Sequence, residues 1–324
     1  MNEWEELKMK KLAMASLVAM MAVAVPATVV CADELKFTTG GDQGTYYGFG
    51  SVLAGQVSGA TDTTVTAITS GGSQANIDAL DFGDAELAFV QSDVMSYAYE
   101  GTNIFEGYAV DTFSTVAALY MEQVQIVTCN PEIKSVADLA GKNVSIGAPG
   151  SGVYFNAMDI LGAYGLTEED IVPTYESFGD SVDSLQDGKI DAAFIVAGAP
   201  TTAVTTLATA KDIYLVSLDE EHVAKLIETC PYYSENTIAA DVYGLEGDTT
   251  TVAVGAVVIA SDEVSEDDVY NFVSTVFENV EEITAAHAKG AELDLEYATS
   301  VTYVPYHAGA AKYFAEKGIE VPTK

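Results

Sequence analysis

The sequence predicts an α/β protein built from two similar units, each a mixed, mostly parallel sheet flanked by helices. Short apolar segments alternate with glycine-rich loops and amphipathic segments from Leu35 onward, which is typical of strands joined by crossover helices. The same plan begins again after residue 122. Of the 324 residues, 49% are hydrophobic, so the chain has enough apolar surface for two cores.

Residues 1–32 are typical of a secretory signal peptide. Lys8, Lys10 and Lys11 precede an apolar run over 12–25, which is too short to span a bilayer, and small residues lead up to Ala32. Acidic residues precede the lysines, which points to Met9 as the translation start. Cleavage after Ala32 and lipid attachment at Cys31 both stay open. In either case we expect a protein secreted across the cytoplasmic membrane, periplasmic or at the extracellular face.

Residues 33–122 are predicted to form the first part of lobe 1. Alternating or continuous apolar residues indicate strands, and apolar residues at helical spacing indicate the helices between them. The long β-like run over 115–128 is the expected first passage between the lobes. The predicted strands are 35–39, 63–69 and 87–90, and the predicted helices are 47–58, 74–82 and 94–99.

Residues 123–250 are predicted to form lobe 2, and residues 251–324 to return across the hinge and add C-terminal helices to lobe 1. The run over 251–261 is again strongly β. Apolar residues at helical spacing predict one long amphipathic helix over 269–287. The predicted strands of lobe 2 are 143–147, 190–196 and 213–218, and its predicted helices are 135–139, 153–164 and a segment that ends at 207.

Cysteine and histidine usage gives no metal or cofactor site. Cys129 and Cys230 follow the leader segment, and free thiols are favoured over a disulfide, which stays open. The three histidines, His222, His287 and His307, have no metal-ligand spacing. We therefore expect no metal and no cofactor.

The charge is strongly acidic and contains no arginine. Forty-nine acidic side chains face 13 basic ones, all of them lysine, and the formal net charge is −36. Binding to nucleic acid or to an anionic membrane surface needs cations, so both are excluded. A secreted protein kept soluble by self-repulsion and a salt-adapted source both fit this charge.

The loops that follow the predicted strands are the expected ligand site. In open α/β sheets the ligand lies beyond the carboxyl ends of the strands, where helix N-termini offer free backbone N–H groups. Here those loops are rich in Gly, Ser, Thr, Gln and Asn, and Gly41, Gly72 and Gly150 are candidates for turns with positive φ. They span residues 40–47, 70–76, 91–93, 150–156 and 197–201.

The sequence lacks three common motifs of enzymes: the nucleophile elbow, the dinucleotide fingerprint and the phosphate-binding loop. Ser151 has Pro149 and Val153 where a nucleophile elbow needs glycine. Neither a complete dinucleotide fingerprint nor a phosphate-binding Gly-Lys-Ser/Thr loop occurs in the chain. The sequence therefore predicts a binding protein and not an enzyme.

At these loops the sequence resembles the substrate-binding receptors of TRAP transporters of the TAXI type. The matching stretches occur in family order and cover nearly all of the chain after residue 32. They are 39–47 (TGGDQGTYY), 70–76 (SGGSQAN), 87–93 (LAFVQSD), 97–101 (YAYEG), 138–142 (DLAGK), 147–152 (GAPGSG), 191–200 (DAAFIVAGAP) and 304–310 (VPYHAGA).

The resemblance implies a two-lobed periplasmic-binding-protein-like (type II) fold with a ligand cleft between the lobes. It implies a monomeric extracytoplasmic receptor that closes around a small anionic solute, such as a glutamate-like amino acid or a C4 or C5 dicarboxylate. The partner implied is an integral-membrane permease with fused subunits, driven by an ion gradient. The implied ligand-binding residues are Thr45, Tyr46, Tyr47, Ser73, Asn76, Gln91 and Ser92 from lobe 1, and Ser151, Gly152, Asn156, Gly198 and Pro200 from lobe 2.

Three other functions stay open at this point. A solute-binding protein of an ABC importer has a similar fold. An enzyme that makes a pyrimidine precursor also shares the fold. Such an enzyme needs a histidine-rich site and normally lacks a signal peptide, and this sequence matches neither feature. A surface adhesin or antigen would bind no small ligand.

Overall fold

The computed structural model describes residues 34–324. The expected signal peptide, Met9 and Cys31 lie outside the described residues. Within the described part, ten strands form one hydrogen-bonded sheet in the order β2-β1-β3-β10-β4-β7-β5-β6, with β8 on β4 and β9 on β10. The strands are β1 (Leu35–Thr38), β2 (Val65–Ile68), β3 (Leu87–Gln91), β4 (Phe113–Thr128), β5 (Asn143–Ser145), β6 (Val172–Thr174), β7 (Ala192–Ala197), β8 (Tyr214–Leu215), β9 (Ser234–Ile238) and β10 (Thr249–Ser261).

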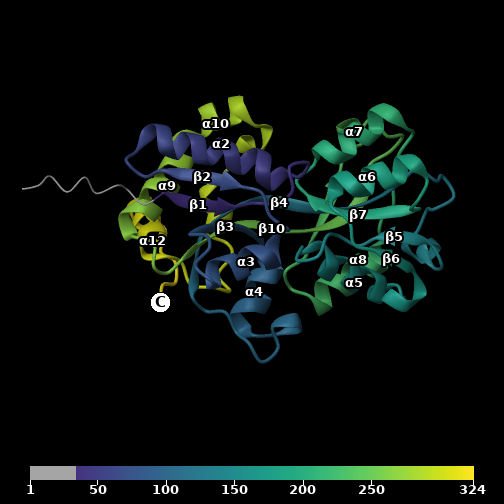
Figure 1. The fold of residues 1–324 in the computed structure, drawn as a ribbon, viewed down its shortest axis with the longest axis horizontal. Coiled ribbons are helices and arrows are strands. Elements are labelled where there is room, and N and C mark those ends of the chain that lie inside the picture. Colours follow the sequence, from purple (N-terminus) through teal and green to yellow (C-terminus); the bar gives the residue numbers. More distant parts are fainter. Residues whose placement is uncertain (1–33) are drawn as a thin grey trace, which may run out of the picture. The chain divides into compact units, whose positions relative to one another are not determined.

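Helices cover both faces of this sheet (Figure 1). We call the part around β1, β2 and β3 lobe 1 and the part around β5, β6 and β7 lobe 2. The α-helices are α2 (Thr45–Ala60), α3 (Ser73–Asp81), α4 (Ser92–Glu100), α5 (Val153–Ala163), α6 (Phe178–Asp187), α7 (Thr202–Ala210), α8 (Glu220–Thr229), α9 (Glu266–Glu278), α10 (Val280–Ala286), α11 (Leu295–Ala298) and α12 (Ala308–Glu316). Residues 34–324 also contain five short 3-10 turns, which are η1 (Asn103–Phe105), η2 (Val136–Leu139), η3 (Glu168–Asp170), η4 (Ala240–Val242) and η5 (Ala288–Glu292).

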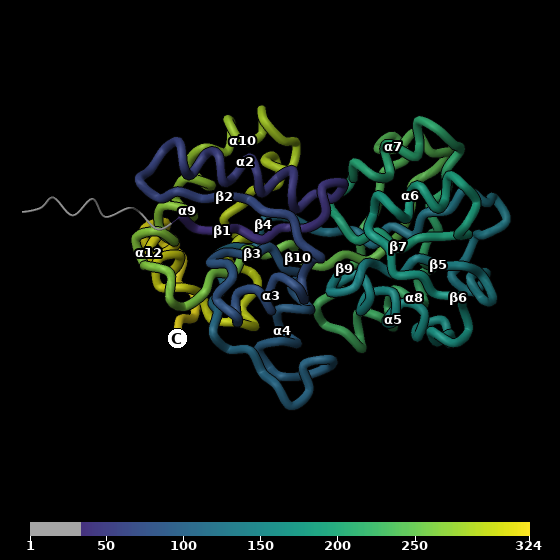
Figure 2. Tube along the Cα trace, viewed as in Figure 1, coloured from purple at the N-terminus to yellow at the C-terminus, as the bar shows by residue number. Residues whose placement is uncertain are grey.

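Strands β4 and β10 are shared by both lobes. They pair antiparallel from Ala253 opposite Gln123 to Ser261 opposite Phe113, with two bulges on the way. Toward lobe 1, β10 pairs with β3, and toward lobe 2, β4 pairs with β7. The tube in Figure 2 shows both strands running through the middle of the molecule. The predicted lobe boundaries at 122/123 and 250/251 fall inside these two strands.

Each lobe has a hydrophobic core on each face of the sheet. In lobe 1, α2, α9 and α12 cover one face over Phe37, Phe49 and Phe272, and α3 and α4 cover the other over Ile77 and Val94. In lobe 2, α5 and α8 cover one face and α6 and α7 the other. Helices α2, α3, α5 and α6 follow the parallel strands β1, β2, β5 and β6, so their N-termini come after the carboxyl ends of these strands.

The predicted helix over 269–287 is wrong, because two helices occupy this segment. Asn279 ends α9 with φ −119° and ψ 35°, and α10 begins at the next residue. The side-chain Nδ2 of Asn279 donates to the carbonyl of Thr275 at 2.8 Å, and the same carbonyl accepts the Asn279 backbone N–H. An asparagine that bonds the nearby backbone in this way favours a helix end over a helix interior.

Two further sequence expectations are settled by the described residues. Cys129 and Cys230 are both free and pack in different cores, so no disulfide joins them. Gly72 and Gly150 have φ of 112° and 82°, as expected for turns that require glycine, whereas Gly41 is not among the residues with positive φ.

Among residues 34–324, no helix combines the length and the apolar character needed to cross a membrane.

The contact between α9 and α12 depends on Gly309. A Cβ at this position would collide with the Glu266 carbonyl and come within 2.8 Å of the Tyr270 nitrogen. We predict that Gly309→Ala lowers the free energy of unfolding by about 1–3 kcal/mol, because the added methyl forces the two helices apart. Urea unfolding followed by circular dichroism measures this loss.

Gly55→Ala is the matched control for that substitution. Gly55 is exposed in α2, and a Cβ there meets nothing within 4 Å. This variant should be more stable than the wild type by about 0.5–1 kcal/mol, because alanine favours a helix. Equal effects of the two substitutions would show that the α9–α12 contact does not need glycine.

Candidate functional site

A pocket of about 90 Å³ lies between the two lobes, beyond the carboxyl ends of β1, β2, β3, β5 and β7. Lobe 1 contributes the loops before α2 and α3, and lobe 2 contributes the loops before α5 and α6. The lining residues are Gly40, Gly41, Gly44, Thr45, Tyr46, Ser70, Gly71, Gly72, Ser73, Gln91, Glu122, Ala148, Ser151, Gly152, Val153, Ser177, Phe178, Val196 and Ala197.

Three helix N-termini converge on this pocket. Helices α2, α3 and α5 are each preceded by a glycine, at Gly44, Gly72 and Gly152, and none of these glycines offers a side chain to cap the helix. The first backbone N–H groups of a helix have no partner within the helix, and they carry a partial positive charge. Glycine caps therefore leave N–H groups from both lobes available to a bound anion.

Glu122 lines the pocket from β4 and is only 2% exposed. The Tyr46 hydroxyl donates to its Oε2 at 2.6 Å. Burial raises the pKa of the Glu122 carboxyl to about 8; nearby Asp93 raises it as well, whereas the Tyr46 hydrogen bond and Lys289 lower it. At neutral pH this carboxyl group therefore holds a proton most of the time.

The wall beside Glu122 is hydrogen-bonded. Ser73 Oγ accepts the backbone N–H of Gln91 at 3.1 Å, and Ser73 lines the pocket together with Tyr46. Burial raises the pKa of Tyr46 well above its usual value, so Tyr46 stays a donor to Glu122. Ser73, Tyr46 and Glu122 thus place three polar side chains along the pocket lining.

The two lobes touch each other around the pocket. The Ala75 N–H of α3 donates to the Gly150 carbonyl across the cleft at 3.0 Å. A Cβ on Gly152 would collide with Gln91 Oε1, and one on Gly71 would lie 3.0 Å from the Pro149 carbonyl. The structure is therefore a closed form of the two lobes, and glycines allow the close approach.

A buried polar network links the pocket to the rest of the lobe interface. Gln91 Nε2 donates to Asn156 Oδ1 at 3.0 Å, and Asn156 Nδ2 donates to Asp93 Oδ2 at 2.9 Å and to the Tyr233 hydroxyl at 2.8 Å. The Tyr233 hydroxyl in turn donates to Asp159 Oδ2 at 3.0 Å. Gln91 and Asp93 belong to lobe 1 and Asn156, Asp159 and Tyr233 to lobe 2, so this network joins the two lobes in the closed form.

Six of the twelve residues implied by the resemblance line the pocket, and six lie elsewhere. Asn76 lies beneath it, where Nδ2 donates to the carbonyls of Thr39 and Phe89, and Asn156 lies behind Gln91. The six lining residues are Thr45, Tyr46, Ser73, Gln91, Ser151 and Gly152. Of the others, Ser92 accepts the Gly255 N–H, Gly198 accepts the Thr45 hydroxyl, Tyr47 is half-buried outside the pocket, and Pro200 is exposed.

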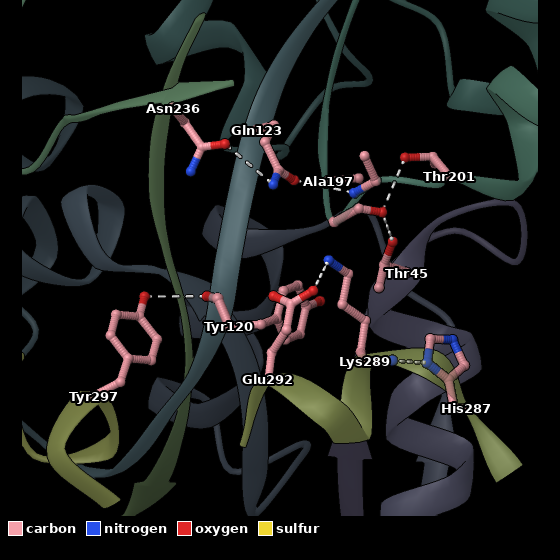
Figure 3. Close-up of polar contacts among 12 residues, drawn as sticks. Thr45, Tyr120, Gln123, Ala197, Thr201, Asn236, His287, Lys289, Glu292 and Tyr297 are labelled. Atoms are coloured by element: carbon pink, nitrogen blue, oxygen red, sulfur yellow. Dashed lines mark hydrogen bonds and ion pairs between the residues drawn. The ribbon is translucent and has the colours of Figure 1, made fainter. Parts of the chain in front are cut away.

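Two charged residues near the pocket were missed at the level of sequence. Glu122 is the one carboxylic acid in a buried strand whose other side chains are apolar or neutral, a signal that could have singled it out because an unpaired acid is seldom buried. Lys289 is 4% exposed, pairs with Glu292 at 2.5 Å and lies 5.4 Å from the centre of the Tyr120 ring. Figure 3 shows Lys289 near Thr45, with its ammonium group directed at Glu292. Lys289 is far in sequence from every loop of the site, so no local pattern indicated that it lies near the pocket.

A model of the NMT1-like family matches residues 37–318. The chain belongs to the NMT1-like family.

Solved structures similar to this NMT1-like protein share its fold. MatC from Rhodopseudomonas palustris, solved with bound malate, is 14% identical over 80% of this chain and 89% of that chain, with a TM-score of 0.56. A protein from Bordetella bronchiseptica RB50 is 17% identical over 87% and 88% of the two chains, with a TM-score of 0.52. A periplasmic transporter is 14% identical over 79% and 87%, with a TM-score of 0.51. The predicted periplasmic-binding-protein fold of type II is confirmed.

Asp93 makes the stability of this NMT1-like protein depend on pH. Burial raises the pKa of its carboxyl to about 7, well above the usual value of about 4. Between these two values Asp93 holds more protons in the folded state than in the unfolded state, so its contribution to stability is greatest below about pH 4 and falls as the pH rises toward 7. We predict that Asp93→Asn reduces this fall by about 1 kcal/mol per pH unit.

Urea unfolding of the solute-free protein at about pH 5 and about pH 7 measures this effect. Asn at position 93 still offers an oxygen to Asn156, so the network can persist. Asp62→Asn, at an exposed turn, is the matched control and should leave the pH slope unchanged. Identical slopes for the wild type and Asp93→Asn would mean that the carboxyl is ionised in the folded state.

Proposed function

We propose that this NMT1-like protein is the extracytoplasmic solute-binding receptor of a TRAP-type (TAXI) secondary transporter. It captures a small anionic solute by closing its lobes and delivers it to an integral-membrane permease. The single observation that carries the proposal is the convergence of three glycine-capped helix N-termini, from both lobes, on one small pocket.

An anionic solute fits the donors of this pocket. No lysine is among its lining residues, and the chain has no arginine, so backbone N–H groups and hydroxyls must supply the hydrogen bonds. Ser151 Oγ lines the pocket and is buried without a partner, which leaves a donor for a solute oxygen. Hydrogen bonds to a charged oxygen are roughly twice as strong as neutral ones, so a few of them can hold a small carboxylate.

The volume and the fold agree with that solute class. A cavity of about 90 Å³ admits a small carboxylate and excludes peptides and large sugars. MatC, whose fold is similar, was solved with malate bound. The TAXI assignment itself rests on the ordered sequence stretches from 39–47 to 304–310, and a receptor of an ABC importer is the alternative. A neighbouring gene for a large fused permease would favour TRAP, and one for an ATPase would favour ABC.

Isothermal titration with malate, succinate, glutarate and glutamate tests the solute class. We expect saturable heat with at least one of these anions, together with a smaller radius of gyration in small-angle scattering if the solute-free protein opens in solution. Arginine, glucose and a neutral dipeptide serve as negative controls. Heat from the controls alone would refute the proposed solute class.

Gly152 tests whether capture requires closure. Its φ of −74° suits alanine, yet the added methyl group would collide with Gln91 Oε1 across the cleft. We predict that Gly152→Ala weakens binding of the anion by about tenfold or more, because the closed form becomes a minor state. The unfolding midpoint should stay near that of the wild type.

Gly162→Ala provides the matched control in the same helix. A Cβ at Gly162 meets nothing within 4 Å. This variant should bind as the wild type does. If Gly152→Ala also bound normally, the closed contact between the lobes would have no part in capture.

A further inference from the structure

Glu122 is the one residue with a carboxyl group or a basic side chain among those that line the pocket. An ionised carboxylate at this place would repel the anionic solute that the three helix N-termini attract. Glu122 is also buried, and an uncompensated ion inside a protein costs free energy because it loses its hydration. The site therefore holds two features that conflict unless the charge on Glu122 is removed or paired.

No neighbouring cation pairs with Glu122 in the described part of the chain. Its one side-chain hydrogen bond there comes from the Tyr46 hydroxyl on α2. Lys289 on η5 is the nearest influence of positive charge, but its ammonium group bonds Glu292 instead. The other titratable groups that face Glu122 are Tyr120 on the same strand, Asp93 on α4 and Tyr297 on α11, and none of them supplies a positive charge.

The strands on either side add no partner. Opposite this part of β4, strand β10 presents Val254 and Gly255, and β7 presents Val196 and Ala197. Glu122 has aliphatic neighbours and one hydroxyl donor, so protonation costs less free energy than a buried, unpaired charge. That proton also turns Glu122 from an acceptor into a hydrogen-bond donor.

We propose that Glu122 binds the solute as a neutral carboxyl group and donates its proton in a hydrogen bond to a solute oxygen. The proton stays on Glu122, so no covalent bond forms or breaks. Tyr46 holds the second oxygen of the carboxyl group and fixes its orientation. This inference rests on the proposed capture of an anion, and it adds that the protein binds solute and proton together.

The wild type alone gives a first test by titration with the panel anion that binds. Affinity should be nearly constant from about pH 5 to 7 and then fall by about tenfold for each pH unit above the pKa of Glu122. Near pH 8 the binding heat should differ between phosphate and Tris buffers, because binding takes up a fraction of a proton from the buffer. Near pH 6 that difference should vanish.

Glu122→Gln keeps the shape and a donor but has no titrating proton. We expect this variant to bind the same anion within about tenfold of the wild type at pH 6, with no fall in affinity at pH 9 and no buffer-dependent heat. Glu263→Gln, at an exposed turn outside the pocket, is the matched control and should keep the wild-type pH profile.

The outcomes separate this inference from the proposed function. Binding that is independent of pH, or that strengthens as Glu122 ionises, would overturn the neutral carboxyl and leave the receptor function standing. A loss of binding in Glu122→Gln, with binding in the wild type that weakens below pH 8, would mean that an ionised Glu122 contacts a positive group of the solute. If no panel anion bound the wild type at any pH, the proposed solute class would fall, and this inference with it.

Discussion

The antiparallel pairing of β4 and β10 is the constraint on which the rest of the structure depends. Both strands run from one lobe into the other, and their register places Tyr120 opposite Ala256 and Gln123 opposite Ala253. Gln123 Oε1 accepts the Ala199 N–H at 3.0 Å, which ties the end of β7 to this pair (Figure 3). A shift of one residue along β4 would turn the side chain of Glu122 to the other face of the sheet. The pairing therefore fixes both the connection of the lobes and the floor of the pocket.

Glycines around the cleft serve two physical purposes at once. Gly72 and Gly152 leave the N-termini of α3 and α5 uncapped, which makes their N–H groups available to a ligand. The same two residues let the lobes approach closely, because a Cβ on Gly72 would crowd the Ser151 backbone and one on Gly152 would collide with the Gln91 side chain. Glycine lowers helix stability because the unfolded chain gains conformational freedom. The site thus gives up local stability to gain both anion binding and closure.

The sequence predicted the periodic elements of this fold and most of the loops around the pocket. Strands such as 87–91 and helices such as α5 follow from local apolar spacing, and the rule for the carboxyl ends of strands brought the loops at residues 45, 73 and 151 together. Helix α8 was missed although Asp219 caps it and Val223 and Leu226 lie on its buried face. These signals were present in the sequence.

Other features depend on tertiary contacts that no local pattern encodes. The Glu122 carboxyl owes its proton to burial between two lobes, and its partner Tyr46 lies 76 residues away in sequence. Lys289 reaches Gly198 only because the chain returns to lobe 1 after β10. The break at Asn279 depends on one side-chain bond within a segment whose apolar spacing alone predicts a continuous helix.

A crystal structure of the protein with its bound panel anion tests the central claim most directly. We expect a carboxylate of the solute within hydrogen-bond distance of backbone N–H groups at the start of α2, α3 or α5, with contacts from both lobes. We also expect a short contact between a solute oxygen and Glu122. A carboxylate held instead by a lysine, or a solute that contacts one lobe only, would contradict the account.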